Sequence, residues 1–333
     1  MKILVTGAAG FIGAKVCSEL SLSGHDVVGF DNFNDYYSNE LKHKRSTSLG
    51  SGKFWELIEG DIANQKSVGN VIRVARPECV IHLAGQAGVR IPIENWSKYT
   101  EANLEGFSNV ILESAVSGVE NFLYASSSSV YGNESRIPFS ETEANLKPTS
   151  FYGATKLSNE ILARNVSIQS NIRTRGLRFF TVYGPWGRPD MAYFRLIAHA
   201  LTGEEFTLRG DGRIKRDFTF INDAASSVIA LCQQLNSEPL SFFDTVNIGG
   251  GKPSALNELI HAVAKLGGSE MTLKHENPDP QDMSQTIADF SYQNSLIGFK
   301  PEVGLEQGVK ITIEWARNRE IISKLSRWVR SSL

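Results

Sequence analysis

A short strand–turn–helix pattern near the amino terminus restricts the fold more than any other feature of this chain. The apolar run at residues 2–6 leads directly into a loop with glycines at positions 7, 10 and 13, and an amphipathic helical pattern begins near Phe11. Such glycines allow a tight turn in which backbone N–H groups approach a pyrophosphate at the helix N-terminus. The pattern therefore predicts a βαβ unit that binds a dinucleotide.

Asp31 indicates which dinucleotide this is. It ends the second expected strand, residues 26–31, where the ribose next to the adenine would lie. A carboxylate there accepts hydrogen bonds from a ribose diol and repels a 2′-phosphate. The position therefore favours NAD over NADP as the cofactor.

β-Rich runs alternate with longer helical patterns through the first half of the chain. Strands are expected at residues 2–6, 26–31, 54–59, 79–84, 121–127 and 172–180, and helices at 97–117 and 150–167. Strands separated by helices predict right-handed crossovers, and hence an α/β fold with a Rossmann-type doubly wound parallel sheet. The rhythm breaks after Tyr183, and shorter elements follow, with strands returning near residues 217–221 and 245–248.

The composition excludes several classes of protein. Lysine and arginine total 34 and aspartate and glutamate 36, so the net charge of −2 gives no reason to expect nucleic acid or an acidic membrane as a partner. No charged leader precedes the first strand, and no apolar run approaches the roughly 18 residues of a membrane span. The cysteines are widely spaced and form no metal-ligand pattern: Cys17, Cys79 and Cys232. We therefore expect reduced thiols, no bound metal, and a soluble cytoplasmic protein.

A Ser, Tyr and Lys constellation follows the glycine loop. Four serines, residues 126–129, come at the end of the fifth strand, and Tyr152 and Lys156 lie four residues apart on one face of a helix. A phenol has a pKa of about 10, so proton transfer at neutral pH needs nearby positive charge that favours phenolate. An ammonium at Lys156 supplies such charge, and a hydroxyl at Ser127 can share the proton. Tyr152, Lys156 and Ser127 are therefore the expected catalytic residues.

Together these motifs resemble the extended short-chain dehydrogenases/reductases, and specifically the NAD-dependent nucleotide-sugar epimerases of the UDP-glucuronate 4-epimerase type. The resemblance covers nearly the whole chain. It is carried by TGAAGFIG (6–13), DNFNDYY (31–37), HLAGQAGVR (82–90), YASSSSVYG (124–132), YGATK (152–156), RFFTVYGPWGRPDMA (178–192), RDFTFIND (216–223) and TIAD (286–289). Two positions depart from the family's pattern, since Gly85 stands where alanine is usual and Gln281 where glycine is usual.

The resemblance implies two domains and two sets of binding residues. Residues 1–183, with returning segments near 217–248, form the NAD-binding Rossmann domain, and 184–333 form a smaller, mainly nucleotide-sugar-binding α/β domain. The implied cofactor residues are Gly7, Gly10, Phe11, Ile12, Gly13, Asp31, Asn32, Asp61, Ile62, Leu83, Ala84, Gln86, Asn103, Ser126, Tyr152, Lys156 and Phe179. The implied substrate residues are Ser127, Ser128, Ser129, Tyr152, Thr181, Arg188 and Arg216.

The serines at positions 128 and 129 indicate which reaction follows. The resemblance implies that Tyr152 removes the O4 proton of the sugar while C4 gives hydride to NAD. Related dehydratases and decarboxylases carry acidic residues where this chain has Ser128 and Ser129, and serine has no useful pKa for acid–base catalysis. Return of the hydride to the opposite face of a transient 4-keto intermediate remains. We therefore expect 4-epimerisation of a UDP-uronic acid, UDP-glucuronate to UDP-galacturonate.

A uronate substrate requires that its carboxylate be held, because the 4-keto intermediate is a β-keto acid that loses CO2 readily. The hydroxyls of residues 127–129 and Thr181, together with Arg188, are expected to hold it. A loop salt bridge between Arg188 and Asp190 is the alternative. Arg216 resembles the family's diphosphate-binding arginine, and its alternative is a surface charge at a strand end.

The sequence leaves other functions open, and it assigns structural roles to several further residues. The alternatives in function are a 4-epimerase of neutral sugars of the UDP-glucose/UDP-galactose type, a uronate decarboxylase, and a non-catalytic NAD-binding regulator. Family analogy implies a homodimer in which the helices bearing Asn103 and Tyr152 pair. His82 is expected to be a core histidine, and residues 42–45 a solvated basic helix face from which one lysine can approach the cofactor phosphates. Residues 311–329 are expected to be a helix that packs on its own domain.

Overall fold

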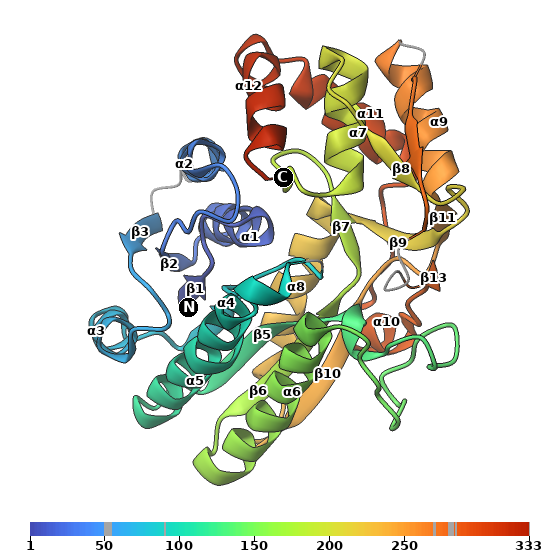
Figure 1. Ribbon diagram of the computed structural model, residues 1–333. Helices are drawn as coiled ribbons and strands as arrows, with labels where there is room; N and C mark the ends of the chain where they lie inside the picture. The colour runs from blue at the N-terminus through green and yellow to red at the C-terminus, as the bar shows by residue number, and fades with distance from the viewer. Residues whose placement is uncertain (50–54, 90, 269–270, 279–282, 284, 333) are drawn as a thin grey trace.

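The computed structural model describes residues 1–49, 55–89, 91–268, 271–278, 283 and 285–332 (Figure 1). Phe54, Arg90 and Gln281, which entered the sequence interpretation, lie outside these residues. Within them, seven parallel strands form one sheet in the order β10-β6-β5-β4-β1-β2-β3. The strands are β1 (Lys2–Thr6), β2 (Asp26–Asp31), β3 (Trp55–Glu59), β4 (Cys79–His82), β5 (Asn121–Ser127), β6 (Arg173–Phe179) and β10 (Phe243–Ile248). The Rossmann-type sheet predicted from the sequence is confirmed.

Alternation along the strands sends apolar side chains to both faces of this sheet. Ile3 and Val5 of β1 pack on the side of α1 (Phe11–Leu22) and α8 (Ile221–Leu235). Leu4 packs on the opposite side, against α3 (Gln65–Ala75), α5 (Phe107–Val116) and α6 (Phe151–Ser170). The result is a three-layer α/β/α arrangement in which the carboxyl ends of all seven strands meet at one edge.

A smaller region lies beyond that edge (Figure 1). Its sheet joins β7 (Thr181–Tyr183), β9 (Lys215–Phe220), β11 (Pro253–Ala255) and β13 (Gln285–Thr286), and β8 (Thr207–Arg209) pairs with β12 (Lys274–Glu276). Its helices are α7 (Ala192–Thr202), α9 (Leu256–Gly267), α10 (Ser291–Ile297), α11 (Leu305–Ala316) and α12 (Arg319–Arg330). Of the two strands expected to return, β10 joins the large sheet beside β6, whereas β9 pairs with β7 in the smaller sheet. The domain boundary at residue 183 stays a prediction.

Three local expectations were wrong in detail. The helix expected at residues 97–117 is divided into α4 (Ser97–Tyr99), a π-helical turn (Thr100–Gly106) and α5. The stretch at 311–329 spans two helices, because the chain turns at Asn318, whose side chain caps α12. The basic run on α2 (Asn39–Leu49) is not a solvated face, since Lys42 is 4% exposed and Arg45 0%.

Among the described helices, none combines the length and apolar character that crossing a bilayer requires. The described residues also contain no group of three or more His, Cys, Asp or Glu side chains placed to hold a metal ion.

Candidate active site

The glycine loop lies where β1 ends and α1 begins. Gly7 has φ +71°, and a Cβ on it would lie 2.6 Å from the backbone nitrogen of Ala84. A Cβ on Gly13 would lie 2.0 Å from the carbonyl oxygen of Gly7. Glycine at both positions therefore lets α1 start directly against the strand ends.

The first turn of α1 is suited to a pyrophosphate. Gly10 is the N-cap of α1, and no side chain caps the helix there. The leading N–H groups of a helix have no partner within it, and they attract an anion together with the helix dipole. The N–H groups of Phe11, Ile12 and Gly13 therefore fit the phosphate oxygens of a dinucleotide.

Asp31 supports the glycine loop from the end of β2. Its carboxylate accepts hydrogen bonds from the backbone of Ala9 at 3.0 Å and of Phe33 at 2.8 Å. Each oxygen has a second lone pair that a ribose hydroxyl can use. The same carboxylate can therefore order the loop and bind the diol.

The neighbouring strand ends are joined by amide–carboxylate bonds. Asn32 donates to Asp61 at 2.8 Å, and Asp61 also accepts from the backbone of Ala63 at 2.8 Å. Asn109 of α5 donates to the carbonyl oxygen of Ile62 at 3.0 Å. Asn32, Asp61 and Ile62, all implied cofactor residues, thus form one wall. The sequence interpretation did not include Asn109, which lies far from this wall along the chain.

His82 and the residues that follow it form the floor of the loop. The Nδ1 of His82 lies 2.8 Å from the hydroxyl of Thr6. Burial, helped by the charge of Lys156, lowers the pKa of His82 to about 3, so the ring is neutral. The backbone N–H groups of Leu83 and Ala84 bond to the carbonyl oxygen and the hydroxyl of Thr6.

Asn103 connects two parts of the site. Its side chain accepts from the backbone of Gln86 at 2.8 Å and donates to the carbonyl oxygen of Gln86 and to the hydroxyl of Thr155, each at 3.1 Å. Asn103 sits in the π-helical turn, and such turns recur at functional sites. It thereby fixes the loop after β4 to α6, the helix that carries Tyr152.

Tyr152, Lys156 and Ser127 meet at the start of α6. Ser150 caps this helix by accepting from Gly153 at 3.0 Å, so Tyr152 falls in the first turn and Lys156 in the next. The Nζ of Lys156 donates to the carbonyl oxygen of Ala125 at 3.0 Å and lies 5.8 Å from the centre of the Tyr152 ring.

The electrostatics of this cluster prepare a proton transfer. Burial raises the pKa of the Tyr152 phenol, while the positive charge of Arg188 and a hydrogen bond with Ser127 act in the opposite direction. Burial also lowers the pKa of Lys156 to about 8. The charge of Arg188 and the hydrogen bond with Ser127 thus favour the phenolate, which is the form that can take a proton from a bound hydroxyl.

The pKa of Lys156 predicts a pH dependence of stability. Between about pH 8 and 10.4 the unfolded chain binds a proton at Lys156 that the folded chain does not, so the free energy of unfolding should rise with pH, by up to about 1.4 kcal/mol per pH unit. The K156M variant should lose this contribution. Urea unfolding of both proteins across this range measures it, and parallel profiles in the two proteins would contradict it.

Ser126 points away from Tyr152. Its hydroxyl donates to the carboxylate of Glu160 at 2.6 Å, and Glu160 pairs with Arg178 of β6 through bonds of 2.9 and 2.8 Å. Phe179, the next residue of β6, stands opposite Ser127 in the sheet register. The Ser126 side chain thus joins a buried ion pair beneath α6, and only its backbone remains for a cofactor.

The hydroxyls expected to face the sugar stand on two elements. Ser127 and Ser129 lie 3.2 Å apart through their hydroxyl oxygens, and the short helical turn Ser128–Val130 follows β5. Thr181 begins β7 and is in register with Phe218 of β9. Residues 127–129 therefore adjoin Tyr152, and Thr181 comes from the strand that leads into the loop at 184–189.

Arg188 lies beside Tyr152, and it also forms the salt bridge with Asp190 that the sequence left as the alternative to carboxylate binding. Its Nε and Nη2 donate to the two carboxylate oxygens of Asp190 at 3.0 and 2.6 Å. Tyr36 donates to the same carboxylate at 3.2 Å. Because the pair with Asp190 uses Nε and Nη2, the Nη1 edge of Arg188 is the one that can donate to a sugar substituent.

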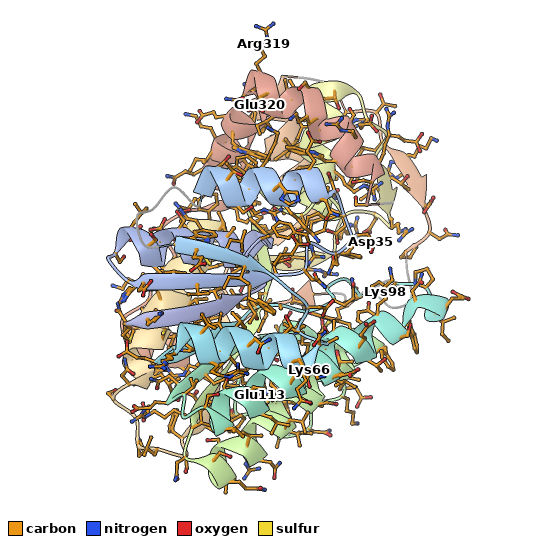
Figure 2. All side chains as sticks on the ribbon, turned by 90° about the vertical axis from the view of Figure 1, so that its left-hand side faces the viewer. Asp35, Lys66, Lys98, Glu113, Arg319 and Glu320 are labelled. Atoms are coloured by element: carbon orange, nitrogen blue, oxygen red, sulfur yellow. The ribbon has the colours of Figure 1, made fainter. Side chains whose placement is uncertain are left out.

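The loop after β2 and helix α4 meet next to Tyr152 and Arg188. Asp35, in the loop after β2, pairs with Lys98 of α4 at 3.6 Å, and Figure 2 shows both at the same edge of the molecule. The neighbouring Tyr99 donates to the carbonyl oxygen of Gly88, and its ring centre lies 6.0 Å from that of Tyr152. The sequence interpretation missed Tyr36, Tyr99 and Asp190 as parts of the site. The DNFNDYY run was a signal for Tyr36.

Arg216 stands on β9, on a different element from the Tyr152 cluster, and its guanidinium donates to the carbonyl oxygen of Lys215 at 2.9 Å. The adjacent Asp217 is fully buried and accepts from the backbone of Gly250, Gly251 and Ala288 at 2.8, 2.8 and 3.1 Å. Burial raises the pKa of Asp217, and these bonds oppose the rise. Asp217 therefore orders the loops beside Arg216.

Comparison with known proteins gives consistent results. A family profile described as "NAD dependent epimerase/dehydratase family" matches residues 3–249. A probable UDP-glucuronate 4-epimerase of Rhizobium meliloti (strain 1021) is 36% identical over 329 residues, covering 95% of this chain and 96% of that protein.

Solved structures extend the similarity to three dimensions. UDP-glucuronic acid 4-epimerase from Bacillus cereus, in complex with UDP-glucuronic acid and NAD, has a TM-score of 0.88 and 33% identity, and the match covers 98% of this chain and 100% of that one. MoeE5, in complex with UDP-glucose and NAD, has a TM-score of 0.84 and 32% identity, with 95% and 99% coverage. The profile, the relative and both structures point to one family. This chain belongs to the NAD dependent epimerase/dehydratase family.

Proposed function

We propose that this protein is an NAD-dependent isomerase that interconverts UDP-glucuronate and UDP-galacturonate by inversion at C4 of the sugar. The observation that carries the proposal is the buried cluster of Tyr152, Ser127 and Lys156 with the Arg188–Asp190 pair beside it. The probable UDP-glucuronate 4-epimerase of Rhizobium meliloti and the UDP-glucuronic acid 4-epimerase of Bacillus cereus support it through their similarity over nearly the whole chain.

Each residue of the cluster has one role in this proposal. NAD, when bound, accepts the hydride from C4 and returns it. Tyr152 takes the O4 proton and later gives it back, Ser127 shares that proton, and Lys156 stabilises the phenolate by its charge. The 4-keto sugar rotates before the hydride returns to the opposite face of C4. Because C4 regains the hydride that it lost, no net oxidation results.

The cofactor wall is assigned on the contacts described above. The first turn of α1 holds the pyrophosphate and Asp31 the ribose diol. Leu83, Ala84, Phe179 and the backbone of Ser126 line the nicotinamide side. The adenine side consists of Asn32, Asp61 and Ile62, while Gln86 and Asn103 keep the loop after β4 in place.

The carboxylate of a uronate is held by Thr181, the hydroxyls of residues 127–129 and the Nη1 edge of Arg188. Neutral hydroxyls bind the carboxylate without supplying a proton, and no acidic side chain stands at position 128 or 129. Loss of water or CO2 therefore has no catalyst there. Arg216 is proposed to contact the diphosphate from the smaller region at residues 184–333.

Proton NMR of the purified protein tests the proposal. The protein is incubated with UDP-glucuronate in one tube and with UDP-glucose in another, and the anomeric proton signals of the sugars are followed. A UDP-galacturonate signal in the first tube only, without CO2 or NADH, supports the uronate assignment. A pentose signal would contradict the role assigned to residues 128 and 129.

A neutral-sugar 4-epimerase is the second candidate. MoeE5 has been solved with UDP-glucuronic acid and also with UDP-glucose, at 33% and 32% identity to this chain. A UDP-galactose signal from UDP-glucose favours this candidate. If neither incubation gives a product signal although NAD is bound, a non-catalytic NAD-binding regulator is favoured.

The protein is further proposed to act as a homodimer in the cytoplasm. Adjacent faces of α5 and α6 expose apolar side chains that a second copy can cover, namely Leu112, Val116, Ile161, Leu162 and Ile168. The buried free thiols Cys17, Cys79 and Cys232 suit a reducing compartment.

The dimer proposal predicts that one negative charge placed on the exposed face of α6 separates the two chains. The wild type should elute with the mass of two chains in size exclusion with light scattering, and I161E should elute as one chain, because Ile161 is 57% exposed on α6. Leu22, which is 74% exposed on α1, provides the control variant L22E, which should keep the wild-type mass. A monomeric wild type would refute the dimer.

A further inference from the structure

Arg45 connects three segments that are distant in sequence. Its side chain is fully buried although it lies on a basic run of α2. Its Nη1 donates to the carbonyl oxygen of Ala9 at 2.7 Å and to the hydroxyl of Tyr37 at 2.8 Å. Its Nε and Nη2 donate to the carbonyl oxygens of Trp186 at 2.8 Å and Gly187 at 3.3 Å. One guanidinium thus holds the glycine loop and the loop that leads to Arg188.

The loop that Arg45 holds has an unfavourable backbone conformation. Trp186 has φ +64°, in the left-handed region, which is unfavourable for a residue other than glycine. Such a conformation persists only where surrounding contacts over-determine it. The Trp186 ring packs against Trp315 at 5.2 Å between centres, and its carbonyl oxygen is bound by Arg45. Two residues further on is Arg188, whose positive charge acts on Tyr152.

Helix α2 is itself held firmly, so Arg45 projects from a fixed support. Glu40 of α2 accepts from the Trp328 indole at 3.1 Å and pairs with Lys324 at 2.9 Å, both on α12. Lys44 pairs with Glu320, and Figure 2 shows Glu320 on α12 above the helix α2. These contacts fix α2 to the carboxyl-terminal helices on its outer side, and Arg45 reaches inward.

We propose that Arg45 is a positioning residue that fixes Arg188 in the sugar site by linking the 184–190 loop to the glycine loop. The inference rests on the proposed function, because Arg188 is assigned there to the sugar carboxylate. A guanidinium has five donors in a planar fork, whereas an ammonium cannot reach the Ala9 and Trp186 carbonyl oxygens in the same geometry. The conformation of the 184–190 loop therefore depends on the guanidinium of Arg45 and not only on its positive charge.

The test compares R45K, R45M and the control Y37F as NAD-loaded proteins. Y37F removes one partner of Arg45 without touching either loop. Hydrogen exchange followed by mass spectrometry should show faster exchange of peptides covering residues 184–190 in R45K and R45M, and wild-type exchange in Y37F. In R45K the KM for UDP-glucuronate should rise about tenfold, and kcat should change less than about threefold, as expected for lost substrate binding.

A double-mutant cycle with R188M separates positioning from general stability. If Arg45 acts through Arg188, the KM of R45K/R188M should match that of R188M within about twofold, because the two changes remove the same contact. Multiplied effects, or a wild-type KM in R45K, would overturn the proposal. If R45M does not fold, R45K, which keeps the charge, decides alone.

These readouts separate this inference from the proposed function. Turnover by the wild type tests the function, and exchange of the 184–190 loop tests the link without any substrate. Faster loop exchange in R45K together with an inactive wild type would refute the function and leave the link in place. Unchanged exchange in R45K with an active wild type would refute the link alone.

Discussion

Replacing Tyr152 by phenylalanine should lower kcat for UDP-glucuronate epimerisation by about 100- to 10,000-fold, which is the usual contribution of a positioned acid–base group. The variant loses only the hydroxyl that hydrogen-bonds to Ser127. Its ring can keep the packing against Tyr99, whose centre is 6.0 Å away. The anomeric proton signals of UDP-glucuronate and UDP-galacturonate measure the rate.

A matched variant separates the chemistry of this hydroxyl from the general loss of a phenol. Tyr292 donates to Asp244 at 2.8 Å and contacts none of the site residues described above. Y292F should keep wild-type kcat, and Y152F should keep NAD affinity, measured by titration. A Y152F enzyme within tenfold of the wild type would assign the proton transfer to another group.

Replacing Arg178 by methionine should lower the free energy of unfolding by about 3–5 kcal/mol, the usual cost of leaving one partner of a buried ion pair alone. Arg178 and Glu160 are 3% and 5% exposed, and two hydrogen bonds join them beneath the catalytic helix. Methionine leaves the Glu160 carboxylate with only the hydroxyl of Ser126. Urea unfolding followed by circular dichroism measures the difference.

Two further variants show whether burial is the cause. R178M/E160L removes both charges and should recover much of the lost stability, because no uncompensated charge remains. K265M breaks the exposed pair between Lys265 and Glu306 and should leave the unfolding midpoint unchanged. An R178M midpoint equal to that of K265M would mean that the buried pair is not needed for stability.

Agreement between sequence and structure was best where a pattern is local. The strands at residues 2–6, 26–31 and 121–127 have the predicted bounds, because apolar alternation and turn residues act over a few positions. Tyr152 and Lys156 face one way because helical spacing requires it. The predicted helix at 97–117 was wrong because the π-helical turn around Asn103 depends on bonds to Gln86 and Thr155.

Charged residues were predicted least well. Residues 42–45 read as a solvated face, yet Lys42 donates to the Asn34 side chain at 2.8 Å and Arg45 is enclosed. Arg188 was expected to hold a carboxylate or to pair with Asp190, and the structure shows the pair with Asp190 while placing Arg188 beside Tyr152. A charged side chain looks the same in a sequence whether it is solvated or buried, because its cost depends on its partners.

The sequence by itself determined the parallel sheet, the glycine loop at the start of α1, and the helix face that carries Tyr152 and Lys156. Each of these follows from residues that are close together in the chain, whose sterics and hydrogen bonding are local. Only the tertiary structure decided that Arg45 reaches Trp186, at a separation of 141 residues, and that Tyr36 reaches Asp190, at 154. Bonds over such separations exist only after the layers have packed, because a polar group that loses water on burial is stabilised by a partner within the protein.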